Sequence, residues 1–122
     1  MIQKRISTYF YQMNNEFITN WETVEEIVLQ RFGEKLDEQT ILFIIGLQEL
    51  GKGKKEYEKE EKLDIIHIGI CTVLGKLGYY QLIGKDDEGW PHYKNIKKLP
   101  IELQGNSQEI FLKKAIINYF NL

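Results

Sequence analysis

The sequence lacks the features that would tie it to a disulfide-stabilised, membrane-spanning or polyanion-binding class. It has one cysteine, which excludes an intrachain disulfide and any Cys-rich metal module and favours a reducing compartment. Its 16 basic and 18 acidic residues leave a formal net charge of -2, so no cationic surplus drives binding to nucleic acid or anionic membranes. Its apolar runs fall far short of the roughly 20 residues of a membrane span, and no signal peptide is readable. We expect a cytoplasmic protein with no membrane contact.

The composition is that of one globular domain. Hydrophobic residues make up 43% of the chain and aromatic residues 12%, a content that argues against disorder and supplies one core. No internal repeat, low-complexity tract or long linker divides the sequence. We therefore predict a single helical domain over residues 1–122.

Apolar residues three and four positions apart predict helices that bury one face. The predicted helices cover residues 16–32, 37–50, 55–75 and 110–120. Asp37 is placed to cap the second helix, whose run from Ile41 to Leu47 is apolar on every side and is therefore expected to be central. Asn106 and Glu109 have the spacing of a capping box at the start of the last helix. Residues 1–13 form a short helix or an ordered arm.

A β-hairpin is predicted at about residues 79–97, after the third helix. Two strand-like runs flank a turn in which Gly89 supplies a positive φ, and Pro91 restricts its strand to an edge because it has no amide proton to donate. The predicted fold class is mainly α (α+β), a compact bundle of four to five helices with one antiparallel β-hairpin. The order of elements is similar to the winged-helix arrangement, in which the third helix enters the DNA groove.

Two glycines lie within helices where glycine costs about 1 kcal/mol relative to alanine. Gly46 lies in the second helix and Gly69 in the third. Such a cost is offset where two helix backbones approach closely. We predict that both glycines lie at the same helix crossing, and that leucine at either position destabilises the domain.

Polar residues form a stripe along the third helix. Glu60, Asp64, His67 and Cys71 step by four, three and four positions and so share one face. Asp64 and His67 have a spacing found in helical metal sites, and Glu49 is placed to serve as a third ligand or a base. The plainer interpretation is that Asp64 and His67 satisfy each other while Cys71 packs as a small apolar group. The chain has only one such pair, so we expect neither metal nor cofactor.

The hairpin carries a second candidate surface. Asp86, Asp87 and Glu88 stand before a glycine, where acidic residues favour a tight turn and offer too few oxygens for calcium. Trp90 and His92 follow them, and tyrosines of the two strands add to an aromatic side. The alternatives are a plain turn and a tip that binds a partner.

Three segments of the chain together resemble a family of small bacterial proteins. They are GLQELG at 46–51, EEKLDIIH at 60–67 and DEGWPH at 87–92. The likeness spans roughly residues 41 to 120, and the family's motifs carry no assigned chemistry. The resemblance implies a bacterial cytoplasmic protein. It directs attention to Glu49, Asp64, His67, Trp90 and His92.

Three functions remain open at this stage. The first is a non-enzymatic protein-interaction or self-assembling module, expected to form a homodimer, because the helix from Ile110 to Phe120 is very apolar for a monomer's surface. The alternative is a metal-dependent or acid-base enzyme centred on Asp64 and His67. The third is weak nucleic-acid binding through lysines that follow the hairpin turn, which the neighbouring acids and the apolar third helix disfavour. These lysines are Lys94, Lys97 and Lys98.

Overall fold

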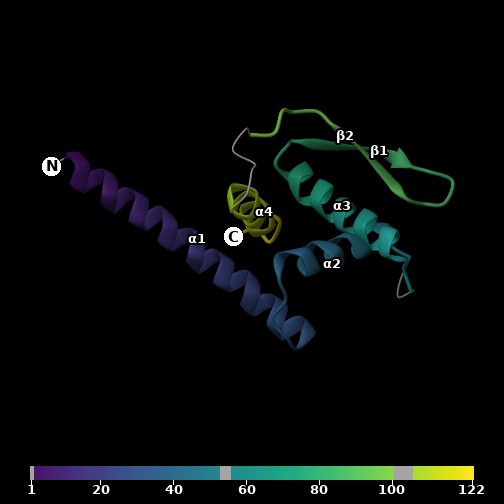
Figure 1. Ribbon diagram of the computed structural model, residues 1–122, viewed down its shortest axis with the longest axis horizontal. Coiled ribbons are helices and arrows are strands. Elements are labelled where there is room, and N and C mark those ends of the chain that lie inside the picture. Colours follow the sequence, from purple (N-terminus) through teal and green to yellow (C-terminus); the bar gives the residue numbers. More distant parts are fainter. Residues whose placement is uncertain (1, 53–55, 101–105) are drawn as a thin grey trace.

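Helices dominate the computed structural model, which describes the backbone of residues 2–52, 56–100 and 106–122 and the side chains of 15–52, 56–100 and 108–122 (Figure 1). The elements are α1 (Ile2–Phe32), α2 (Glu38–Leu50), α3 (Lys59–Lys76), β1 (Tyr80–Lys85), β2 (Pro91–Asn95) and α4 (Asn106–Tyr119). The two strands form one antiparallel sheet. The predicted class, a mainly α bundle with one β-hairpin, is confirmed.

The first helix is longer than the sequence predicts. The predicted helix over 16–32 and the predicted short helix or arm over 1–13 are one continuous helix, α1. Asn14 and Asn15 do not end it, because each costs only tenths of a kcal/mol relative to alanine within a helix. The amino-terminal half of α1 extends beyond α4 (Figure 1). None of the described helices combines the length and the apolarity that a bilayer crossing requires.

Local capping interactions fix the boundaries of α2 and α3. Asp37 Oδ1 accepts a hydrogen bond from the Thr40 amide at 2.8 Å, and Gly51 ends α2 with a φ of 69°, as the sequence predicts. α3 starts later than predicted, because the Glu58 amide donates to Glu61 Oε1 at 3.0 Å just before Lys59. The predicted capping contact of Asn106 lies outside the described side chains, although α4 begins at that residue.

The hydrophobic core joins all four described helices. Its main cluster contains buried residues of every helix, namely Val24, Val28, Ile41, Leu42, Ile45, Val73, Leu74, Ala115, Ile116 and Ile117. A smaller cluster of Leu50, Tyr57 and Ile65 lies under Trp90 of the hairpin. α2 contributes to both clusters, which explains why its sequence is apolar on every side.

The apolar surface of α4 is largely covered by its own chain. Ala115, Ile116 and Ile117 are buried, and the aromatic residues Phe111 and Phe120 pack against the main core. Ile110 is the large apolar residue of the described part of α4 that remains exposed. The apolar character of α4 therefore reflects intramolecular packing, and it does not by itself indicate self-association.

Two glycines allow α2 and α3 to cross in contact. A Cβ atom on Gly46 would lie 2.0 Å from the carbonyl oxygen of Ile65, and a Cβ on Gly69 would lie 2.0 Å from that of Leu42. Each glycine thus meets the backbone of the other helix, one turn from the other glycine. The predicted shared crossing is observed, and the two helices run antiparallel through it.

The hairpin lies along α3 (Figure 1). Its register pairs Leu82 with Tyr93 and then Gly84 with His92, which leaves a β-bulge at Ile83 that the sequence analysis did not predict. Gly89 has a φ of 86° in the turn, as predicted. Nearly all of β1 is exposed, so the hairpin is held mainly through the start of β1 and through β2.

Candidate binding groove between the third helix and the hairpin

A groove between α3 and the hairpin brings together residues from both candidate surfaces. Its volume is about 420 Å³. Asp64 and His67 approach it from α3, and Asp86, Trp90 and His92 approach it from the hairpin. The remaining lining residues are Glu61, Ile68, Glu88 and Pro91. The packing of the hairpin on α3 turns two separate sequence motifs into one site.

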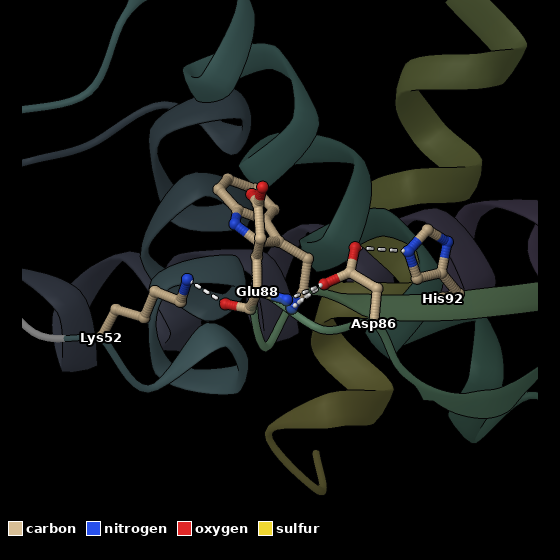
Figure 2. A network of polar contacts seen from close by, with 5 residues as sticks. Lys52, Asp86, Glu88 and His92 are labelled. Atoms are coloured by element: carbon tan, nitrogen blue, oxygen red, sulfur yellow. Dashed lines mark hydrogen bonds and ion pairs between the residues drawn. The ribbon is translucent and has the colours of Figure 1, made fainter.

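Asp86 organises the hairpin side of the groove (Figure 2). Its Oδ1 accepts hydrogen bonds from the amides of Glu88 and Trp90, each at 3.0 Å, and its Oδ2 lies 2.9 Å from Nε2 of His92. The hydrogen bond from His92, followed by that from Trp90, lowers the pKa of Asp86. Asp86 thus holds the turn and orients the imidazole, while Asp87 does not line the groove.

One ammonium group of the chain already lies at the rim of the groove. Lys52, which follows α2, donates a hydrogen bond to the carbonyl oxygen of Glu88 (Figure 2). Its Nζ also lies 5.6 Å from the centroid of the Trp90 ring, within the range of a cation–π interaction. The Glu88 carbonyl and the Trp90 ring are therefore both in contact with an ammonium group of the same chain.

Two carboxylates of the groove remain available to a ligand. The side chains of Asp64 and Glu88 are exposed and make no polar contact with any described residue. With Glu61 and Asp86 they bring the groove to four carboxylates, and no lysine or arginine is found among its described lining residues. The groove is therefore strongly acidic.

The stripe along α3 divides between solvent, groove and core. Glu60 is exposed and lies outside the groove, and so does Glu49 of α2. Cys71 is fully buried, and its Sγ lies 3.5 Å from Nε2 of His67. Burial raises the pKa of the Cys71 thiol to about 11, so at neutral pH the sulfur is a protonated thiol and a poor nucleophile.

The geometry does not assemble a metal centre from the described side chains. Within 15–52, 56–100 and 108–122, no three of the His, Cys, Asp and Glu residues lie close enough to share one ion. Asp64 and His67 form no hydrogen bond with each other; the described polar partner of His67 is Cys71. Asp64 and His67 both line the groove, Glu49 lies outside it, and the three do not form a metal-binding cluster among the described residues.

Sequence reasoning missed three contributors to the groove. Glu61 also caps α3, Glu88 was assigned only to the turn, and Lys52 is 36 positions from its partner Glu88. The spacing of Glu58 and Glu61 was the one local signal for any of them. No protein-family model, curated protein or solved structure matches the chain, so the resemblance to small bacterial proteins stays an expectation.

Proposed function

We propose that the protein is a non-enzymatic interaction module of the bacterial cytoplasm whose groove binds a lysine or arginine side chain of a protein partner. The observation that carries the proposal is the set of four carboxylates that line the groove beside Trp90, without a lysine or arginine among the described lining residues. A cationic side chain gains from both features, since it pairs with carboxylates and stacks on an aromatic face.

Two details of the groove support a cationic ligand. Asp64 and Glu88 have no described partner and stand on opposite sides of the groove, on α3 and on the hairpin. Lys52 provides an intramolecular precedent, because it already places an ammonium group against Trp90 and the Glu88 carbonyl. A partner's cation would extend this arrangement into the groove.

The same features disfavour the enzymatic and nucleic-acid alternatives. The buried, protonated Cys71 is unsuited to nucleophilic catalysis, and Asp86 and His92 are occupied with each other in the turn. An acidic groove beside α3 repels phosphates, and the ammonium of Lys97 lies 4.6 Å from the Tyr79 ring centroid. A protein partner is the better match for this surface.

A tetralysine peptide tests the proposal. We expect the folded protein to bind the peptide weakly, with amide shifts in the NMR spectrum confined to α3 and the hairpin, and binding weakened by salt. The double variant Asp64→Asn, Glu88→Gln should bind roughly three- to tenfold more weakly, because each exposed pair contributes about 0.3 to 0.7 kcal/mol.

The matched control is Glu22→Gln on α1, which contributes no residue to the groove. This variant removes one exposed carboxylate and should bind the peptide as the unaltered protein does. A tetraglutamate peptide should not bind. If Glu22→Gln weakens tetralysine binding as much as the groove variant does, the attraction is general and the proposal is wrong.

A different observation favours self-association as a second candidate. Three large apolar side chains around the hairpin are more than half exposed: Leu82 (53%), Ile83 (67%) and Ile96 (52%). β1 and β2 form a two-stranded sheet, so each leaves one backbone edge unpaired. A second copy of the chain can cover the apolar side chains and pair an edge, giving the homodimer that a symmetric contact produces.

Sedimentation velocity across micromolar concentrations tests the homodimer. The unaltered chain should show a concentration-dependent sedimentation coefficient, and Ile83→Lys should raise the dimer dissociation constant at least about tenfold through the loss of apolar burial. Ile18→Lys, at a side chain that is 50% exposed on α1, serves as the control. A chain that sediments as a monomer at every concentration would remove this candidate.

A further inference from the structure

A second cavity, of about 400 Å³, opens between α1, α2, the end of α3 and the end of α4. It shares no residue with the acidic groove. Its apolar lining consists of Val28, Phe32, Ile41, Ile44, Ile45 and Phe120. Its polar lining consists of Arg31, Gln48, Lys76 and Tyr119.

The inner part of the cavity belongs to the core. Val28, Ile41 and Ile45 are buried residues of the main hydrophobic cluster, so the floor of the cavity is apolar. Phe32, which is 47% exposed, stands at its outer side. The volume is within the roughly 300 to 1,000 Å³ of pockets for small molecules, and it is too small for a helix of a protein partner.

The polar groups of the cavity are cationic or neutral. Arg31 and Lys76 come from the last turns of α1 and α3, and neither side chain forms an ion pair or hydrogen bond with a described residue. No carboxylate is found among the described lining residues. Burial, and to a lesser extent the charge of Glu49, raises the pKa of Tyr119, so its hydroxyl stays protonated at neutral pH and can donate.

We propose that this cavity binds a small amphiphilic carboxylate, an alkyl or aryl carboxylic acid in its ionised form. The apolar body lies against Phe32, Ile44 and Phe120, the apolar lining residues that are not buried, and the carboxylate lies toward Arg31 and Lys76. Charge complementarity selects this class, because an uncharged apolar molecule leaves both cations without a partner and a cationic one is repelled by them. The proposal is independent of the acidic groove and of its function.

Calorimetric titration with decanoate, below its critical micelle concentration, tests the assignment. We expect one-site binding, with 1-decanol at least about fivefold weaker and decyltrimethylammonium weaker still. The double variant Arg31→Gln, Lys76→Gln should bind decanoate roughly tenfold more weakly while binding decanol unchanged. Thermal melting of the variant checks that it is folded.

The control variant is Lys62→Gln, which removes an exposed cation of α3 outside the cavity and should leave decanoate binding unchanged. Equal binding of decanoate and decanol, insensitive to Arg31 and Lys76, would mean general apolar adsorption and would overturn the proposal. Absence of decanoate binding would overturn it as well. A loss of binding in Lys62→Gln equal to that of the double variant would show that the cavity does not select the anion.

Discussion

Alanine at Gly46 or Gly69 is expected to destabilise the protein by roughly 2 kcal/mol and to lower the melting temperature by about 5 to 10 °C. Alanine normally stabilises a helix by about 1 kcal/mol relative to glycine. Here the added Cβ would lie 2.0 Å from a backbone carbonyl oxygen of the facing helix, whereas ordinary contacts begin near 3.4 Å. Because the obstructing atom is backbone, the added methyl forces α2 and α3 apart.

Thermal melting of the two variants, with Gly75→Ala as control, measures this effect. Gly75 is also helical, and the nearest atom to its added Cβ is the Tyr80 carbonyl oxygen at 3.4 Å, so alanine there should be neutral or slightly stabilising. The double variant should lose less stability than the sum of the losses in the two single variants, because one separation of the helices relieves both contacts. Melting temperatures at or above that of the unaltered protein would show that the crossing is not close.

The Cys71 thiol is expected to react with a disulfide reagent at least about 100-fold more slowly in the folded protein than in the unfolded chain. The ordinary pKa of the thiol is 9.0, and burial raises it to about 11, which lowers the thiolate fraction near neutral pH by about that factor. Full burial of the side chain slows the reagent further. Absorbance of the released thiolate, with and without concentrated guanidinium chloride, measures both rates.

The raised pKa of Cys71 also gives a pH dependence with a definite sign. The folded state favours the neutral thiol, so this contribution to stability is fully present below pH 9.0 and is lost as the pH rises toward about 11. Cys71→Val removes the titrating group and should flatten the change in stability over that range. Labelling of the folded protein as fast as that of the unfolded chain would show that the thiol is accessible.

Interactions between near neighbours made part of this fold predictable. Asp37, Gly51 and Gly89 were assigned correctly because caps and turns depend on a few adjacent residues. Gly46 and Gly69 were assigned to one crossing because glycine destabilises a helix, and close packing against another helix offsets that loss. In both cases the residue type and its position along the chain are enough to make the prediction.

The groove depended on tertiary packing and could not be predicted from spacing. The spacing of a polar stripe on one helix face does not reveal which of its residues the rest of the fold buries. In the structure Cys71 lies in the core, His67 lines the groove and Glu60 is exposed to solvent. The hairpin that completes the groove packs on α3 through the start of β1 and through β2, and its rim contact joins Lys52 to Glu88 across 36 positions. The sequence around Lys52 gives no sign of the contact with Glu88, and the sequence around Glu88 gives no sign of the contact with Lys52.

A ligand bound in the groove would stabilise the packing of the hairpin against α3. The two sides of the groove belong to α3 and to a hairpin whose first strand is almost entirely exposed. A ligand that bridges Asp64 and Glu88 binds only the docked hairpin, so it stabilises docking by an amount that grows with the logarithm of its concentration above the dissociation constant. By reciprocity, any contact elsewhere that holds the hairpin against α3 raises the affinity of the groove.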